Sequence, residues 1–372
     1  MTSSLPLLLG AVLVAGLLGA PATGTTAPEH RQTSHGLAEH LAQPATPGGD
    51  DTGVAGHTGA GNSAEQRRVL AYWTPRRMAA AAPIGLLGPV TGVLGAVTGL
   101  LGLKASFETP GTRPSVVRLA ARPGGRSAVR SVKAPPGATR TRYGARVGGA
   151  RWGAGGQVAR TTGRVFMTLG GTDFVCSASS VRSANADLVV TAGHCVKNGT
   201  GAWADNWVFV PGYDRGRRPY GQFTARRMFV TGAWARGGDD SHDIGMVAVN
   251  PRGGRHLAEV VGVQDIAFDT ARGRQTHGFG FPADLPYDGE NLVFCAGTVR
   301  DDPHGQTSDQ GLRCDMTAGS SGGPWLSGFD PVTGHGTVTS VSSFKYSDDR
   351  GTMYGPYFGE TARRLYAVAQ RS

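Results

Sequence analysis

Short apolar stretches recur through the second half of the chain, and Gly, Asp, Asn and Pro separate them. No long helical pattern interrupts these stretches, which are short enough for strands. Together they predict an all-β domain over residues 161–372, a length that fits two packed antiparallel barrels, at about 161–252 and 253–372. The strand-like stretches are 165–169, 174–177, 188–191, 207–210, 227–231, 244–249, 266–268, 291–299, 323–326 and 336–344.

The end of the chain changes to a helical period. Phe358, Ala362, Leu365, Tyr366 and Ala369 recur on one face of a helix, with charged and polar residues off that face. This spacing predicts a C-terminal helix that packs through its apolar side.

The N-terminal part has a different composition. Residues 1–22 contain an apolar core at 7–18 followed by Ala-Pro-Ala, which predicts a cleaved signal peptide. A membrane anchor is the alternative, and two glycines within the short apolar core disfavour it. Residues 23–77 are polar and rich in Gly, Thr, His and Pro, so we expect them to be disordered or loosely folded. Residues 23–160 would then form a largely disordered pro-region and linker.

Residues 79–103 carry no charge and contain a near-repeat of seven residues. Their glycines recur at spacings of three and four, which would place them on one stripe of a helix. Such a stripe permits close contact with another helix or a membrane partner, and the length would span a bilayer. Helical glycines are costly in water. Packing within a pro-region, membrane association and disorder therefore remain open for this segment.

The net charge of +10 is concentrated in residues 113–164, which hold twelve Lys or Arg and no Asp or Glu. Without them the chain is near neutral, so the β domain is not a basic surface for nucleic acid. The stretch fits a solvated linker, a processing region or a segment that binds an anionic polymer.

Three short motifs carry the candidate chemistry. Ala192-Gly193-His194-Cys195 follows one apolar run, Asp243-Ile244 begins another, and Gly319-Ser320-Ser321-Gly322-Gly323-Pro324 is typical of a strained turn. A serine becomes a good nucleophile when a base takes its proton, and that base needs a carboxylate to orient it. The chain supplies these parts in the order His194, Asp243, Ser321. The backbone N–H groups of Gly319 and Ser321 could stabilise an oxyanion. An ordinary tight turn is the alternative for the serine motif alone.

These motifs resemble the three signatures of chymotrypsin-like serine endopeptidases, in the secreted bacterial branch that includes the glutamyl endopeptidases. The resemblance covers about residues 161–372. It implies a two-barrel fold, a catalytic triad of His194, Asp243 and Ser321 in the cleft between the barrels, and a final helix packed on the second barrel. It also implies peptide-bond hydrolysis through an acyl-enzyme, protein or peptide substrates and no cofactor or metal. Ser320 stands where trypsin has its activation aspartate, so we expect inhibition by a steric pro-segment instead.

The four cysteines allow three pairings, and no Cys-x-x-Cys pair suggests zinc. The resemblance favours a bridge between Cys176 and Cys195, beside the catalytic histidine, which leaves Cys295 with Cys314. Disulfides indicate an oxidising compartment and hence a secreted, extracellular protein.

Substrate preference is less defined. Asp315, six residues before Ser321, stands where trypsin has its pocket-floor aspartate, and a buried carboxylate there would select Arg or Lys. The stretch with Ser340 and Ser342 matches the pocket wall, where glutamyl enzymes have a histidine that is absent here. His242 is expected to be a surface or supporting residue.

The sequence thus predicts a secreted, trypsin-like serine endopeptidase, made as a preproprotein zymogen and monomeric when mature. One alternative is a catalytically silent relative that acts as a binding module. The other is a protein that binds anionic surfaces through residues 113–164.

Overall fold

The structure is a computed structural model that describes residues 53–84, 115–117 and 146–372. The predicted signal peptide, most of the glycine repeat at 79–103 and much of the basic stretch lie outside the described residues. Among the residues that are described, no helix has both the length and the apolar character needed to cross a membrane.

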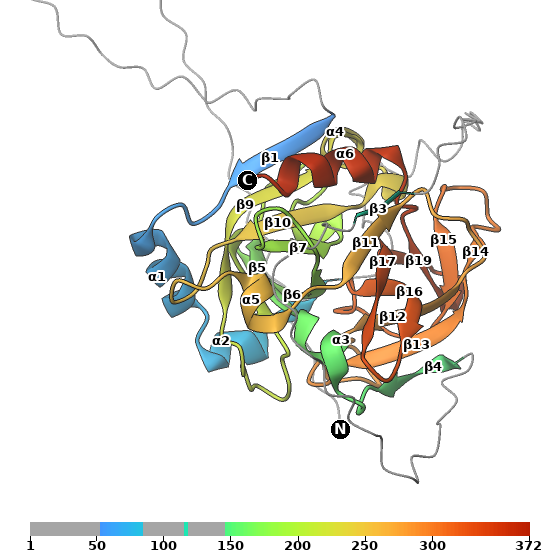
Figure 1. Cartoon of the computed structure of the whole chain (residues 1–372), viewed down its shortest axis with the longest axis horizontal. Helices are drawn as coiled ribbons and strands as arrows, with labels where there is room; N and C mark the ends of the chain where they lie inside the picture. Colours follow the sequence, from blue (N-terminus) through green and yellow to red (C-terminus); the bar gives the residue numbers. More distant parts are fainter. Residues whose placement is uncertain (1–52, 85–114, 118–145) are drawn as a thin grey trace, which may run out of the picture. The chain divides into compact units, whose positions relative to one another are not determined.

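The first half of the domain is a closed barrel of six strands (Figure 1). Its strands run in the hydrogen-bonded order β9-β10-β7-β6-β5-β8, and β8 pairs back to β9 to close the ring. The strands are β5 (Thr162–Leu169), β6 (Thr172–Ser180), β7 (Leu188–Thr191), β8 (Asp205–Pro211), β9 (Phe223–Thr231) and β10 (Gly245–Val249). All eight residues of β5 are buried, so both faces of this strand are covered.

The second half consists of two sheets, one of seven strands and one of four. The larger contains β3 (Ser115–Val117), β4 (Arg146–Arg151), β11 (Asp265–Phe268), β12 (Gln275–Gly280), β13 (Val293–Thr298), β16 (Pro324–Asp330) and β17 (His335–Val341). The smaller contains β14 (Arg300–Asp301), β15 (Gln310–Arg313), β18 (Phe344–Tyr346) and β19 (Asp349–Gly355). Pairing is antiparallel except between β11 and β17. The helix α5 (Leu257–Val261) lies between the two halves of the chain.

The predicted all-β class is confirmed, and every predicted strand-like stretch contributes to a strand. The prediction missed β12, β15 and β19 of the second half, as well as β3, β4 and the two-residue β14. The sequences of β12, β15 and β19 contain glycines and polar residues in place of an apolar run. Pairing with neighbouring strands, which a short window of sequence does not reveal, places these residues in sheets.

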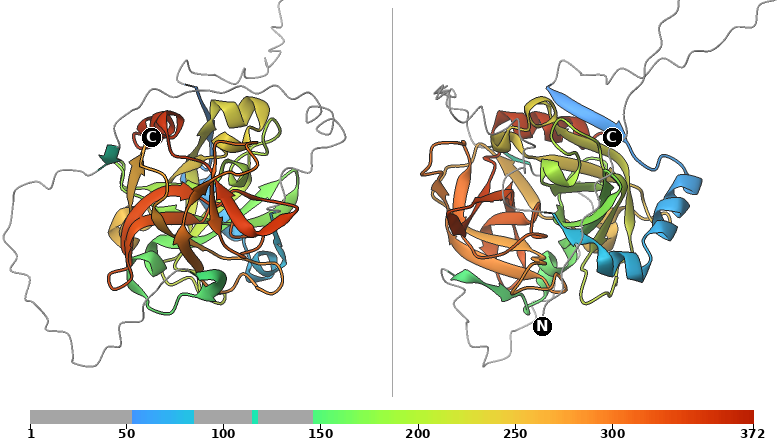
Figure 2. Two further views of the ribbon diagram at one scale, coloured as in Figure 1. Left: turned by 90° about the vertical axis from the view of Figure 1, so that its right-hand side faces the viewer. Right: turned by 180° about the vertical axis from the view of Figure 1, so that it is seen from behind.

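The prediction of disorder does not hold for residues 53–77. This region forms β1 (Val54–Thr58), α1 (Ser63–Tyr72) and α2 (Pro75–Ala80), followed by β2 (Ala82–Pro83) (Figure 2). β1 extends the first-barrel sheet beside β9, and β2 pairs with β6. The side chains of Trp73 and Met78 are buried at 1% and 5% exposure. The apolar surface against which this segment packs belongs to a distant part of the chain. The composition of the segment alone therefore predicts disorder where the segment is in fact folded.

Parts of the basic stretch are also structured. β3 pairs with β11, and β4 pairs with β13, so both belong to the seven-stranded sheet. The helix α3 (Gly156–Thr161) follows and leads directly into β5. A solvated linker therefore does not describe residues 115–117 and 146–164.

The C-terminal helix α6 (Glu360–Ala369) is confirmed. Its buried residues are Ala362, Leu365, Tyr366 and Ala369, the apolar face that the spacing predicts, and Phe358 is buried just before it. The helix packs mainly against β9 and β10. It therefore covers the first barrel, and the expectation that it packs on the second barrel is wrong.

Candidate active site

His194 lies directly after a buried strand of the first barrel. β7 ends at Thr191, and His194 occupies the short 3-10 turn η2 (Gly193–Cys195). Its backbone N–H donates to Oδ1 of Asp243 at 2.7 Å, and its Nδ1 lies 2.7 Å from Oδ2 of the same carboxylate. Asp243 therefore fixes both the backbone and the ring of His194, as the sequence predicts for a base and its orienting acid.

Asp243 is 1% exposed and lies between the turn η3 (Asp240–His242) and β10. Its Oδ2 also accepts a hydrogen bond of 2.5 Å from the hydroxyl of Ser343 in the second half of the domain. Sequence reasoning did not find Ser343, although the residue belongs to the Ser/Thr-rich stretch that was assigned to the pocket wall. The carboxylate thus accepts three hydrogen bonds and links the two halves at the site.

The surroundings of the His194 ring shift its protonation. Burial opposes the charged imidazolium, but the charge and the hydrogen bond of Asp243, with a smaller contribution from Asp240, raise the His194 pKa above its usual value. The ring of Trp234 forms one side of the site, 6.4 Å from the His194 ring, and its Nε1 donates to the Lys197 carbonyl. A Cβ on Gly193 would lie 2.9 Å from both Trp234 and Asp243, so only glycine fits there.

The serine turn precedes β16 and presses against the strand that leads to His194. Gly319 and Gly322 have φ angles of +91° and +77°, which glycine adopts without strain. A Cβ on Gly322 would lie 2.0 Å from Oγ1 of Thr191. The backbone N–H of Ser177 donates to the Ser321 carbonyl at 2.7 Å. The predicted strained turn is therefore present, and it lies next to η2.

The predicted triad lacks the hydrogen bond between its nucleophile, Ser321, and its base, His194. Oγ of Ser321 and Nε2 of His194 are both buried, and among the described residues neither atom has a hydrogen-bond partner. The hydrogen bond that would join Ser321 to His194 is therefore not formed. The backbone N–H groups of Gly319 and Ser321 likewise donate to no acceptor in the described part of the chain. The acid–base pair is thus complete, while the hydroxyl and the two candidate oxyanion donors are unpaired.

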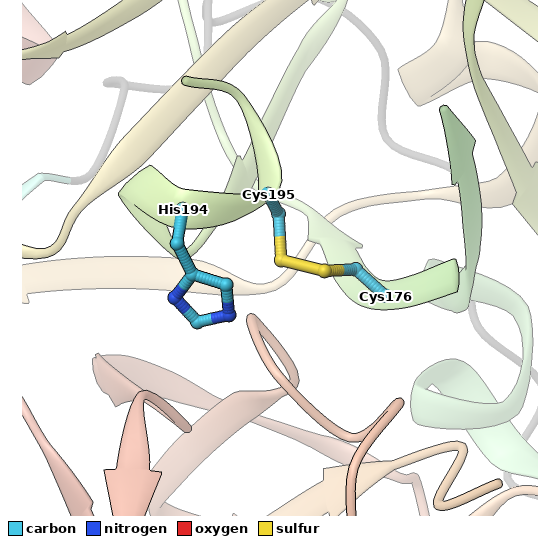
Figure 3. Close-up of side chains that lie close together, drawn as sticks. All are labelled: Cys176, His194 and Cys195. Carbon is cyan, nitrogen blue, oxygen red and sulfur yellow. A yellow bond between two sulfur atoms is a disulfide. The ribbon is translucent and has the colours of Figure 1, made fainter. Parts of the chain in front are cut away.

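Both predicted disulfides are present, Cys176–Cys195 and Cys295–Cys314. The first lies beside the His194 ring (Figure 3), and the Cys195 sulfur is 3.7 Å from the Ser321 carbonyl oxygen. In the described ranges, Cys176, His194 and Cys195 are the single group of three or more possible metal ligands whose ligand atoms all lie within 4.8 Å of one another. Because the two sulfurs are bonded to each other, they offer no thiolate to a metal.

The residues assigned to substrate binding are placed differently from the prediction. Asp315 is exposed, and its Oδ1 accepts hydrogen bonds of 2.7 Å from the N–H of Gly149 and from the hydroxyl of Tyr287. It is therefore not the buried carboxylate that the resemblance to trypsin suggests, because β4 and Tyr287 hold it at the surface. Ser340 and Ser342 are fully buried. Their hydroxyls bond to the Pro356 carbonyl and to Nε1 of Trp325, so both are engaged in packing.

Two further aspartates lie near the acid–base pair. Burial, followed by the charge of Asp243, raises the pKa of Asp240 to about 6. Asp309 is fully buried, and neither of its carboxylate oxygens has a hydrogen-bond partner among the described residues. Burial first, and then the charges of Asp243 and Asp240, raise the pKa of Asp309 well above its usual value. His242 bonds through Nδ1 to Asp239 at 2.9 Å and is partly exposed, in line with a supporting position.

Comparison with known proteins supports this architecture. No protein-family profile matches the chain. The crystal structure of the protease Anisep from Arthrobacter nicotinovorans is similar, with 42% identity and a TM-score of 0.55, over 57% of this chain and 96% of that one. The thermostable serine protease AL20, from an extremophilic microorganism, has 40% identity and a TM-score of 0.55, over 58% of this chain and 99% of that one.

A curated relative is more distant. It is an extracellular metalloprotease of Bacillus subtilis (strain 168), 28% identical over 103 residues, and the match spans a third of that protein's length. The two solved structures define the class of the molecule as a protease fold. At 40% identity or more across nearly the whole of both structures, the chain belongs to the family of chymotrypsin-like serine proteases.

Proposed function

We propose that the chain is a secreted serine endopeptidase, made as a preproprotein, that hydrolyses peptide bonds with Ser321, His194 and Asp243. The observation that carries this proposal is the acid–base pair. Both oxygens of one buried carboxylate hold His194, and the strained serine turn lies against the strand that precedes it. The two similar protease structures support the same reaction class.

In the proposed mechanism, the Ser321 hydroxyl attacks the carbonyl carbon of the scissile peptide while Nε2 of His194 takes its proton. Asp243 keeps the proton on Nδ1 and stabilises the imidazolium that forms. The C–N bond then breaks, His194 protonates the leaving amine, and an acyl-enzyme remains on Ser321. Water attacks this ester by the same route and releases the acid.

The carbonyl oxygen becomes negatively charged in the tetrahedral intermediates. The N–H groups of Gly319 and Ser321 are free of other acceptors in the described part of the chain, so they are available to bind that oxygen. Each such donor contributes on the order of 3 kcal/mol to the stability of the transition state. The positive φ of Gly319 is part of the turn that presents both groups.

The burial of the Ser321 hydroxyl fits a precursor that is not yet active. A substrate must reach this oxygen, so we propose that a cut in the N-terminal region opens the site and lets Ser321 bond to His194. The two disulfides support maturation outside the cytosol. The mature enzyme would act on proteins or peptides as a monomer.

The test is covalent labelling with a fluorophosphonate probe, followed by peptide mass spectrometry. The processed wild-type protein should carry the probe on Ser321, and full-length protein should react much more slowly. Ser321→Ala should abolish labelling. Ser320→Ala is the matched control. The Ser320 hydroxyl donates to the Thr317 carbonyl at 2.6 Å, so it is engaged elsewhere and is not the proposed nucleophile. A processed protein that binds peptides but is not labelled would support the catalytically silent alternative instead.

A further inference from the structure

Residues 53–84, named here the N-terminal clip, are held along the outside of the first barrel by backbone pairing. Five residues of β1 pair with β9, from Val54 opposite Thr231 to Thr58 opposite Arg227. The pairing continues beyond the strand, where the N–H groups of Gly59 and Ala60 donate to carbonyls of β9 at 2.9 and 2.8 Å. The clip therefore adds a complete strand to the sheet edge beside β9.

Apolar packing holds the helical part of the clip. Trp73 is 1% exposed, and its ring lies 5.5 Å from the ring of Phe166 in β5. Its Nε1 donates to the Asn206 carbonyl, so the polar atom of this buried ring is also satisfied. The neighbouring Tyr72 hydroxyl donates to Asp173 at 2.7 Å. This combination of buried aromatic ring and satisfied polar atoms resembles the anchor of a specific protein interface.

The clip has no covalent link to the barrel apart from the main chain. All four cysteines lie between residues 176 and 314 and pair with one another. Residues 85–145 connect the clip to the rest, and this connection is rich in arginine. A cut there would leave the clip attached through its noncovalent contacts alone.

We propose that the outer face of the first barrel, formed by β5, β8 and β9, is a binding site for the N-terminal clip. The clip stays bound as a separate peptide after the chain is cut between residues 85 and 145. The protein that results from processing is then a noncovalent complex of two chains. The bound clip also supports the catalytic side of the barrel. The Gly53 carbonyl accepts a hydrogen bond of 2.6 Å from Gly232, at the start of α4 (Gly232–Gly237), and this helix carries Trp234 beside His194.

The binding test does not depend on catalysis. A recognition sequence for a site-specific protease is inserted between residues 100 and 101 of full-length Ser321→Ala protein, and the purified protein is cut. Size-exclusion chromatography and native mass spectrometry then follow the clip. We expect the clip to remain with the barrel at one copy per molecule, in 1 M NaCl as well as in low salt, because its one ion pair with the barrel, Arg77–Asp173, is half-exposed. Release of the clip as soon as the chain is cut would overturn the proposal.

Matched glycine variants test the docked geometry. A Cβ on Gly59 would lie 2.4 Å from the Ala225 carbonyl of β9, whereas a Cβ on Gly61 would meet no atom closer than 3.7 Å. After cutting, Gly59→Ala should release the clip at least about tenfold faster than Gly61→Ala. Trp73→Ala should accelerate release by about 100-fold or more, compared with Leu70→Ala at a 37% exposed position of α1, the helix that ends just before Trp73. Equal release rates within each pair would show that the clip is not held by this surface.

The supporting role rests on the proposed function and has a separate readout. In the cut and otherwise wild-type protein, Gly59→Ala should lower peptidase activity, and adding excess synthetic clip should restore it. If the clip is retained but no variant hydrolyses peptides, the proposed function fails while the binding proposal stands. If activity is normal after complete loss of the clip, the supporting role is wrong.

Discussion

Two aspartates on neighbouring loops are buried to almost the same degree but have opposite surroundings. Asp243 is 1% exposed and accepts three hydrogen bonds, from the backbone and ring of His194 and from Ser343. Asp309 is 0% exposed, and its carboxylate accepts none within the described residues. The two loops touch, since the Ser308 N–H donates to the Ser241 hydroxyl at 3.0 Å.

The comparison teaches that hydrogen-bond partners, not burial, define what a buried acid can do. Burying a carboxylate is costly unless donors replace the water that it loses. Asp243 has those donors and can orient a base. Asp309 lacks them, and burial with the nearby charge of Asp243 raises its pKa so that it keeps its proton to higher pH. Asp243 therefore suits the role proposed for it, whereas Asp309 lowers the stability of the fold when it is charged.

The largest expected effect comes from changing the partnered acid. Asp243→Asn replaces an acceptor of the Nδ1 proton with an amide, so His194 is held in the wrong tautomer. We expect kcat/KM of the processed enzyme to fall about 10⁴-fold, the loss typical of this change in the family. The unfolding midpoint should be measured alongside, to separate this effect from loss of structure. A loss smaller than tenfold in a folded protein would remove Asp243 from the catalytic machinery.

A smaller loss of activity is expected when the third hydrogen-bond donor to the Asp243 carboxylate, Ser343, is removed. Ser343→Ala removes the 2.5 Å bond to Oδ2 and leaves the two His194 contacts in place. A hydrogen bond to a charged group is worth about 1.5–3 kcal/mol, so kcat should fall by roughly tenfold or more. The His194 pKa should also change, which a purely structural role would not cause.

Ser342→Ala is the matched control for Ser343→Ala. The Ser342 hydroxyl accepts a bond from Nε1 of Trp325 and does not touch Asp243. This variant should lower the unfolding midpoint while the pH profile of kcat stays in place. Indistinguishable pH profiles for Ser343→Ala and the wild type would contradict a positioning role for Ser343.

Much of the partnered site could be predicted from sequence. His194, Asp243 and Ser321 each lie in a short motif next to a strand, and the motifs follow the order of a known family. Ser343 could not be predicted in the same way. Several hydroxyl residues stand side by side in its stretch, and only the register of β17 and the turn after it decides which one faces Asp243. Asp309 gives no local signal at all, because its burial depends on packing between distant loops.

The N-terminal clip was missed for a related reason. Residues 53–77 are polar and glycine-rich over most of their length, and the apolar run Val69–Trp73 is too short to form a core by itself. The partner surface, centred on Phe166, is about a hundred residues away in sequence. Composition reports what a segment could bury alone, whereas a docked segment uses apolar surface supplied by another part of the chain.

The unpartnered acid should affect stability instead of catalysis. The pKa of Asp309 is raised in the folded state, so Asp309 lowers the free energy of unfolding least when it is protonated. Wild-type stability should therefore fall as the pH rises above the usual aspartate value, until the folded-state pKa is passed. Asp309→Asn avoids this cost and should raise the unfolding midpoint at pH 8 more than at pH 4. A gain of about 1 kcal/mol corresponds to about 2–4 °C.

Asp302→Asn provides the contrast for Asp309→Asn. The Asp302 carboxylate accepts bonds from Tyr346, Thr307 and the His304 N–H. Burial opposes its charge, but these donors prevail and lower its pKa. This variant should lose stability at neutral pH. If both variants destabilise the protein equally at pH 8, the difference drawn between partnered and unpartnered acids is wrong.

The smallest expected effect concerns Asp240, which is intermediate between the partnered Asp243 and the unpartnered Asp309. Its pKa is raised to about 6, so it is charged at neutral pH and helps to raise the pKa of His194. His194 must be neutral to accept the serine proton, so the acid limb of the kcat/KM profile follows its pKa. Asp240→Asn removes one negative charge and should move that limb to lower pH, because the Asp240 charge is one of the causes that raise the His194 pKa. Asp239→Asn is the control, since the Asp239 carboxylate pairs with His242 and is 47% exposed. A limb that moves to higher pH in Asp240→Asn, or moves equally in both variants, would show that the Asp240 charge does not act on His194.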